Sequence, residues 1–175
     1  GLEDMDFITE PYNRSVDRKS FDCGLHPALN TYIAQQASQD EKRNVSRTFM
    51  LIEDGQLIGY YTLANASVVE SDLSEEQMKK MPRYPMPAVL LSRLAVDKSQ
   101  QGKGVGKRLM SDFFRRVYVI SKHSGVAFVV VDAKDDDAAR YYKSLDFVET
   151  NTSPLRLALS TGTLIQGYKA LETSD

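Results

Sequence analysis

Residues 91–110 read LSRLAVDKSQQGKGVGKRLM and predict a strand, a glycine-rich loop and a helix in succession. The first part of this stretch closes an apolar run, Ala88–Val96, that predicts a strand. Gln101–Gly106 is a glycine-rich loop, and from Val105 apolar residues recur every three or four positions, which predicts a helix. Glycines let the backbone approach a ligand, and the first amides of a helix are free. The stretch therefore predicts an anion site, suited to phosphate or pyrophosphate.

The sequence on either side of this stretch predicts an α/β domain with a mixed sheet. Arg47–Glu53 and Leu57–Ala66 are β-rich runs, and the Asp54-Gly55-Gln56 turn between them indicates a hairpin. The further expectations are a short strand from Phe7-Ile8, a helix opened by Pro27, a capped helix at Ser74–Gln77, a break at Pro82, Pro85 and Pro87, a buried strand at Val126–Val131, a helix at Asp135–Ser144, closing strands at Phe147–Glu149 and Leu155–Leu159, and a loose C-terminus.

Composition narrows the classes of function. The 175 residues predict a single domain, 1–175, with an ordinary globular balance, no membrane span and no secretion leader, hence a cytoplasmic protein. Cys23 is the only cysteine, and His26 and His123 lie far apart, so a metal site has little support. The net charge of −2 gives no reason to expect nucleic acid. Residues 101–116, however, carry five basic side chains against one acid, Asp112, which favours an anionic ligand.

Two other kinds of phosphate loop fit Gln101–Gly106 less well. A Walker A loop needs Gly-Lys-Ser/Thr, which is missing, and a dinucleotide fingerprint would follow a first strand. A glycine turn without a ligand remains open. The Q-x-x-G-x-G spacing, with Leu94–Asp97 before it and the Asp135–Phe147 segment after it, resembles the pyrophosphate loop of the GNAT N-acetyltransferase superfamily.

The resemblance implies a GNAT fold, a mixed and mostly antiparallel sheet of six to seven strands flanked by helices. It implies direct acetyl transfer from acetyl-CoA, as cosubstrate, to a primary amine, without a metal. Asp135 and Asp146 depart from the Asn and Gly that the superfamily often has there. The implied cofactor-binding residues are Leu94, Ala95 and Val96 of the strand, Gln101, Gly102, Lys103, Gly104, Val105, Gly106 and Lys107 of the loop, and Asp135 and Tyr142.

Tyr142 takes the place of the tyrosine that donates to the leaving thiolate in the superfamily. On reference pKa values, full proton transfer from tyrosine to a thiolate is uphill by about 2 kcal/mol, so a hydrogen bond is its main expected contribution. Spacing alone would make it a packing residue beside Tyr141. No general base stands out in the sequence.

A second resemblance covers the N-terminal half. Phe21–Gly24, Leu29–Ile33, Arg47–Phe49, Gly59–Leu63 and Leu91–Asp97 are similar to segments of the GNAT toxins of bacterial toxin–antitoxin pairs. That likeness implies aminoacyl-tRNA as acceptor, a ribbon-helix-helix antitoxin as partner and a possible homodimer. A protein amine or small-molecule amine, and an acyl-CoA-binding module without turnover, remain alternatives. Arg93 either binds substrate or forms a structural ion pair.

Overall fold

The computed structural model describes residues 7–79 and 85–174. Its seven strands have the order β1-β2-β3-β4-β5-β7-β6 in one sheet, in which β4 and β5 pair in parallel and the other registered pairs are antiparallel. This confirms the predicted mixed, mostly antiparallel sheet. The elements are β1 Glu10–Pro11, α1 Pro27–Thr31, η2 Tyr32–Gln36, α2 Ala37–Lys42, β2 Arg47–Glu53, β3 Gln56–Val68, η3 Glu70–Asp72, α3 Glu75–Met78, β4 Met86–Val96, η4 Lys98–Gln100, α4 Val105–Ser121, β5 Phe128–Asp132, α5 Asp136–Ser144, β6 Val148–Glu149, β7 Arg156–Ser160 and α6 Thr161–Ser174.

The described chain divides into two compact units, and β3, β4 and α4 each contribute residues to both. The N-terminal unit comprises residues 7–64 and 92–115. In it β2 and β3 form the predicted hairpin, whose two turn residues, Asp54 and Gly55, have φ of 51° and 76°. Positive φ at both positions is what a tight two-residue turn requires, which explains the Asp-Gly pair.

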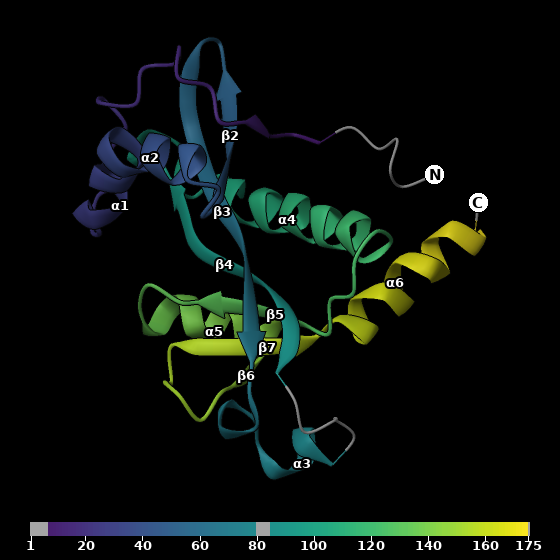
Figure 1. Ribbon diagram of the computed structural model, residues 1–175. Coiled ribbons are helices and arrows are strands. Elements are labelled where there is room, and N and C mark those ends of the chain that lie inside the picture. The colour runs from purple at the N-terminus through teal and green to yellow at the C-terminus, as the bar shows by residue number, and fades with distance from the viewer. Residues whose placement is uncertain (1–6, 80–84, 175) are drawn as a thin grey trace. The chain divides into compact units, whose positions relative to one another are not determined.

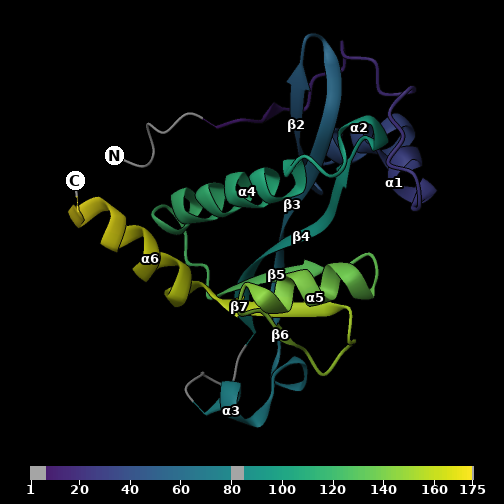
Figure 2. The same ribbon diagram turned by 180° about the vertical axis from the view of Figure 1, so that it is seen from behind.

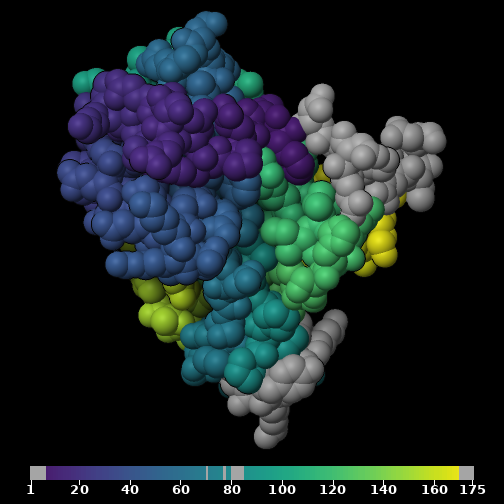
Figure 3. All heavy atoms as spheres, turned by 45° about the horizontal axis from the view of Figure 1, so that its top comes forward, coloured from purple at the N-terminus to yellow at the C-terminus, as the bar shows by residue number. Residues whose placement is uncertain are grey.

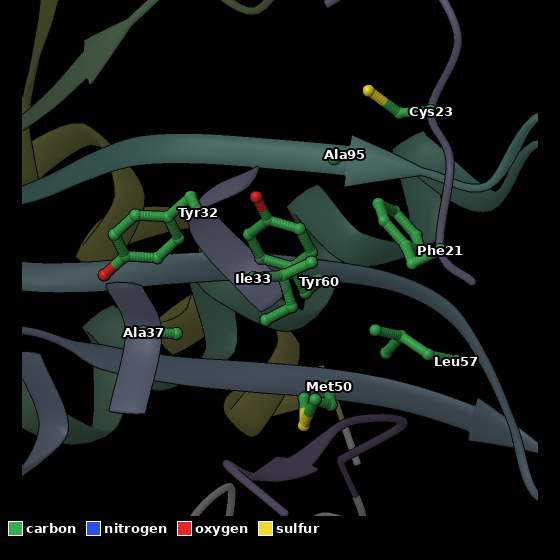
Figure 4. Packing of buried hydrophobic residues seen from close by; sticks show 9 residues of the cluster. All are labelled: Phe21, Cys23, Tyr32, Ile33, Ala37, Met50, Leu57, Tyr60 and Ala95. Atoms are coloured by element: carbon green, nitrogen blue, oxygen red, sulfur yellow. The ribbon is translucent and has the colours of Figure 1, made fainter. Parts of the chain in front are cut away.

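Helices α1 and α2 lie beside the β2–β3 hairpin in the same unit (Figures 1 and 2). Pro27 occupies the first turn of α1, as predicted. Between α1 and α2 the chain takes a π-helical turn, Tyr32–Gln36, which the sequence did not reveal. Tyr32, Ile33 and Ala37 still face inward, and with Tyr60 and Ala95 they belong to a core cluster of nine buried residues (Figure 4).

The C-terminal unit comprises residues 65–79, 85–91 and 116–174. Its centre is β5, which pairs with β4 on one side and β7 on the other, while α5 lies against one face of these strands (Figures 1 and 2). Phe128 and Val130 of β5 pack with Val68, Ala88 and Ala158. The β-branched run of β5 therefore forms a buried strand, as its composition predicted.

Several boundaries differ from expectation. The first strand is Glu10–Pro11 rather than Phe7-Ile8, because the Ile8 amide donates to the Asp112 carboxylate instead of a neighbouring strand. β4 begins at Met86 and includes Pro87, whose carbonyl accepts from Ala127, so this proline does not break the chain. β5 starts at Phe128, two residues later than predicted. Pro82 lies outside the described residues.

The prediction of a loose C-terminus was wrong, because residues 161–174 form α6. Two glycines, Gly162 and Gly167, weaken the helical signal in the sequence. The Tyr168 ring stacks on Tyr118 of α4, with centroids 4.8 Å apart. Tertiary packing of this kind stabilises a helix that local propensity does not announce.

Candidate active site

The glycine loop follows β4 after a short 3₁₀ turn, Lys98–Gln100, that Asp97 caps through its side chain. Gly102 and Gly104 have φ of 78° and 79°, and a Cβ added at either would meet nothing within 4 Å. The left-handed backbone, rather than crowding, is therefore what favours glycine there. α4 begins at Val105, so its first amides adjoin the loop, the arrangement that a phosphate site at a helix N-terminus requires.

A clamp ties the loop to the segment Asp22–Gly24. The Gln101 side-chain amide donates to the Cys23 carbonyl over 2.8 Å and to the Val96 carbonyl over 3.0 Å. The Asp97 carboxylate accepts from the Asp22 amide, and the Lys98 amide donates back to the Asp22 carbonyl over 2.8 Å. The Gln101 side chain therefore holds the loop, and its backbone is the part left to meet a ligand.

The pKa of Asp97 lies below its usual range in spite of burial. Burial opposes ionisation, but hydrogen bonds from Ser99 and from the Asp22 amide outweigh it. An ionised carboxylate at this point accepts several hydrogen bonds at once, which fixes the path from β4 into the loop.

Basic side chains surround the loop and the first turns of α4. Lys103, Lys107 and Arg108 are exposed, and Arg108 lies 3.9 Å from Glu53. The one acid of this stretch, Asp112, is fully buried and accepts from the Ile8 amide, the Thr9 hydroxyl and the Tyr61 hydroxyl. Its charge therefore faces inward and leaves the outer surface of this part of α4 basic.

The purple N-terminal segment crosses the surface of the N-terminal unit and reaches the green of α4 (Figure 3). The Ile8 amide and the Thr9 hydroxyl of this segment donate to the buried Asp112 carboxylate.

Leu94, Ala95 and Val96 form the end of β4. Ala95 is fully buried in the core cluster, whereas Leu94 and Val96 are half-buried. Gly59 lets β3 lie close to the end of β4 and to α4, since a Cβ at Gly59 would lie 2.9 Å from the Ala95 carbonyl oxygen and 3.0 Å from the Leu109 side chain. Neither Gly59 nor the capping role of Asp97 was singled out from the sequence, although a glycine inside a strand is a known signal of close backbone approach.

Arg93 lies on the face of β4 that carries Ala95. Its guanidinium carbon stands 3.6 Å from the centroid of the Tyr32 ring, and Nη1 donates to the Ser92 hydroxyl over 3.1 Å. Within residues 7–79 and 85–174, no carboxylate forms an ion pair with Arg93. The structural ion pair that the sequence left open is therefore absent from the described chain.

Tyr142 lies in α5 of the C-terminal unit and is buried. Asp135 caps this helix by accepting from the Ala138 amide over 2.8 Å, a task that needs only an acceptor and therefore suits Asp as well as Asn. At the other end Asp146 has φ of 74°, the left-handed conformation that favours Gly and that Asp adopts more readily than most residues. The Phe147 amide donates to the Tyr142 carbonyl, and their rings lie 5.8 Å apart.

Those contacts fix the position of Tyr142 from both its backbone and its ring. Burial, with smaller contributions from Tyr141 and the charge of Asp135, raises the pKa of Tyr142. Its hydroxyl therefore keeps its proton at neutral pH and can act as a hydrogen-bond donor.

The predicted residues fall into two groups. Arg93, the end of β4 and the loop Gln101–Lys107 belong to the N-terminal unit, while Asp135 and Tyr142 belong to the C-terminal unit. Among the described residues no group of three or more His, Cys, Asp or Glu could hold a metal ion. Neither α4 nor any other helix in the described ranges has the length and apolar character needed to cross a bilayer.

A family model described as an acetyltransferase (GNAT) domain matches residues 44–149. The chain belongs to the GNAT acetyltransferases. A tRNA-acetylating toxin of Mycobacterium tuberculosis (strain ATCC 25618 / H37Rv) is 36% identical to it over 143 residues, 82% of this chain and 85% of that protein. The resemblance inferred from the loop and its flanking motifs is thereby confirmed.

Solved structures of GNAT toxins share the fold. AtaT complexed with acetyl-methionyl-tRNAfMet matches with a TM-score of 0.83 and 28% identity, covering 93% of this chain and 99% of that one. An AtaT mutant toxin bound to acetyl-CoA and to the C-terminus of the antitoxin AtaR matches with a TM-score of 0.77 and 26% identity, covering 94% and 99%.

Proposed function

We propose that this GNAT acetyltransferase transfers the acetyl group of acetyl-CoA to the amino group of an aminoacyl-tRNA and so blocks translation as a toxin. The observation that carries the proposal is the 36% identity to a tRNA-acetylating toxin over 82% of the chain. The AtaT complex with acetyl-methionyl-tRNAfMet supports the same class of product. Because aminoacyl-tRNA is a cytoplasmic substrate, the proposal implies a cytoplasmic enzyme.

In this proposal the loop Gln101–Lys107 binds the pyrophosphate of acetyl-CoA. Backbone amides at the start of α4 supply the fixed part of the site, and exposed Lys103 and Lys107 add mobile positive charge. The backbone of Leu94–Val96 meets the pantetheine arm and binds the thioester carbonyl. That assignment uses the amides of β4 rather than its side chains, which agrees with the burial of Ala95.

The reaction is a direct acyl transfer. The uncharged amine attacks the thioester carbonyl carbon, the C–N bond forms, the C–S bond breaks, and the amine gives up a proton. The coenzyme leaves as a thiolate and then takes a proton. We assign to Tyr142 the hydrogen bond that stabilises this thiolate, because its buried hydroxyl stays protonated. Asp135 contributes by fixing the start of the helix that carries Tyr142.

Arg93 is our candidate for binding the acceptor. Its guanidinium has no carboxylate partner in the described chain, and a planar cation of this kind suits a phosphate. The proposed protein partners follow from the likeness to GNAT toxins. A ribbon-helix-helix antitoxin is the proposed protein partner, and a homodimer is the proposed assembly.

Purified protein, radiolabelled acetyl-CoA and a panel of aminoacyl-tRNAs test the function. Transfer of label to aminoacyl-tRNA, absent with deacylated tRNA, is the expected result. Label on free amines or protein N-termini with no label on any aminoacyl-tRNA would favour a different acceptor. Binding of acetyl-CoA without transfer to any amine would favour a module without turnover.

A further inference from the structure

Arg93 is a half-buried cation on an inner strand of the sheet, and two side chains hold its guanidinium in place. One donor of its guanidinium goes to the Ser92 hydroxyl, which itself lies 3.0 Å from the Thr62 hydroxyl. Its guanidinium carbon lies over the Tyr32 ring, 3.6 Å from the ring centroid. A guanidinium has five N–H donors, so this arrangement leaves donors in the plane of the group for a ligand.

The Tyr32 ring is itself held rigidly. It is 2% exposed, and its hydroxyl donates to Asp40 over 2.8 Å and lies 3.0 Å from the Ser46 hydroxyl. The ring also stacks on Tyr60, with centroids 6.4 Å apart and planes 20° from parallel. Figure 4 shows the two rings side by side in the core cluster. The ring can therefore serve as a fixed platform.

The backbone at Tyr32 is also specialised. Tyr32 opens the π-helical turn, and Arg18 donates to the Ile33 carbonyl over 3.0 Å within that turn. Single π-helical turns inside helices occur frequently at functional sites. Here the turn sets the direction in which the Tyr32 ring leaves the helix, and Arg18 stabilises it.

Arg93 lies on one face of β4, and the glycine loop lies near the opposite face. Successive side chains of a strand point to opposite faces, so Arg93 shares a face with Ala95, which packs with Tyr32 and Tyr60. The Val96 side chain points the other way and lies 4.0 Å from the position of a Cβ at Gly106. The Arg93 charge therefore belongs to the face covered by the N-terminal helices and is separate from the anion site at the start of α4.

We infer that Tyr32 is a positioning residue for the acceptor, holding Arg93 flat so that its free donors bind a phosphate of the acceptor RNA. This inference rests on the proposed function. Arginine rather than lysine is required, because only a planar group stacks on the ring and presents paired donors to phosphate. The Tyr32 ring would then contribute to substrate binding as well as to core packing.

The test compares the KM for aminoacyl-tRNA with the KM for acetyl-CoA in Arg93→Lys, Tyr32→Met and Tyr32→Phe. Loss of the stacked arrangement in Arg93→Lys and in Tyr32→Met is expected to raise the KM for aminoacyl-tRNA roughly tenfold and to leave that for acetyl-CoA within about twofold. Tyr32→Phe keeps the ring but loses the hydroxyl's hydrogen bonds to Asp40 and Ser46, so its KM for aminoacyl-tRNA is expected to rise less than in Tyr32→Met. In the double variant Arg93→Lys with Tyr32→Met, the KM for aminoacyl-tRNA is expected to be no higher than in either single variant.

The matched control is Arg47→Lys, since Arg47 is already paired with Glu41 at 3.2 Å. It is expected to change neither KM. Arg93→Ala is further expected to lower the salt dependence of acceptor binding by about one phosphate contact. If Tyr32→Met does not fold, Arg93→Lys carries the test, because it keeps the charge and leaves the core intact.

Equal effects on both KM values, or additive effects in the double variant, would overturn the positioning role. So would a normal KM for aminoacyl-tRNA in Arg93→Lys. A wild-type enzyme that acetylates no aminoacyl-tRNA would instead overturn the proposed function, and with it this inference. The wild-type assay therefore separates the two failures.

Discussion

The side-chain amide of Gln101 donates to the carbonyl oxygen of Cys23 over 2.8 Å, joining the start of the glycine loop to a segment 78 residues earlier in the chain. The same amide reaches the Val96 carbonyl at the end of β4. One side chain thus bridges β4, the loop and the Asp22–Gly24 segment. The Asp22–Gly24 segment and the glycine loop are therefore held together by one side chain.

Replacing Gln101 tests that link. Gln101→Met keeps the length of the side chain but removes both donors, so the free energy of unfolding is expected to fall by about 1–3 kcal/mol. Acetyl-CoA affinity is expected to fall as well, because the loop backbone loses its anchor. Urea unfolding and calorimetric titration with coenzyme A measure the two effects. Gln39→Met, an exposed substitution in α2, is the control and should change stability by less than about 0.5 kcal/mol.

Asp97 makes the stability of this region depend on pH. Its pKa is lower in the folded chain than in the unfolded chain, so its ionised form adds stability at neutral pH that is lost as the pH falls towards the lowered value. The difference in unfolding free energy between wild type and Asp97→Asn is therefore expected to narrow below about pH 4. Urea unfolding between pH 3 and 7 measures it, and a difference that stays constant over this range would contradict a role for the Asp97 charge.

Asp146 stores strain at the end of α5. With φ of 74°, it occupies a position that Gly adopts without cost, whereas a Cβ without a polar group is penalised by about 1 kcal/mol or more. Asp146→Gly is expected to raise the free energy of unfolding by about 0.5 kcal/mol and Asp146→Ala to lower it by about 1 kcal/mol. Thermal unfolding of the two variants checks the order, and an alanine variant more stable than the glycine variant would refute it.

Local sequence patterns predicted much of this structure. The hairpin turn at Asp54-Gly55, the buried β5 run and the start of α4 after the glycines all depend on short-range rules, and all were confirmed. α6 was missed because its two glycines weaken the local helical signal and its packing includes the Tyr168–Tyr118 stack, which connects residues far apart in the chain. The π-helical turn at Tyr32–Gln36 was hidden for a similar reason, since the apolar spacing there suits an ordinary helix.

The candidate site shows the same division. The loop and Tyr142 carry motifs that can be read from the sequence, whereas the partners that hold them cannot. The interaction of Gln101 with Cys23 and the stacking of Arg93 on Tyr32 join segments with no sequence signal of proximity. In the sequence Asp112 is the single acid among basic residues of 101–116. Because it is fully buried, it does not offset their charge at the surface.

Asp112 is expected to be the most costly substitution outside the loop. Asp112→Ala leaves the Ile8 amide, the Thr9 hydroxyl and the Tyr61 hydroxyl without their buried acceptor, which is expected to lower the free energy of unfolding by about 3 kcal/mol. Chemical denaturation measures the change. Ser111→Ala, at the exposed neighbouring position, is the control and should stay within about 0.5 kcal/mol of wild type.

Tyr142→Phe separates a catalytic hydroxyl from a packing ring. The variant keeps the ring contacts with Tyr141 and Phe147, so its stability and its KM for acetyl-CoA are expected to stay close to wild type. Its kcat is expected to fall about 100- to 1,000-fold, the usual cost of losing one donor to a developing negative charge. Tyr141→Phe is the matched control, with kcat unchanged. Single-turnover acetylation measures the step directly, and a normal rate in Tyr142→Phe would reduce Tyr142 to a packing residue and require another donor for the thiolate.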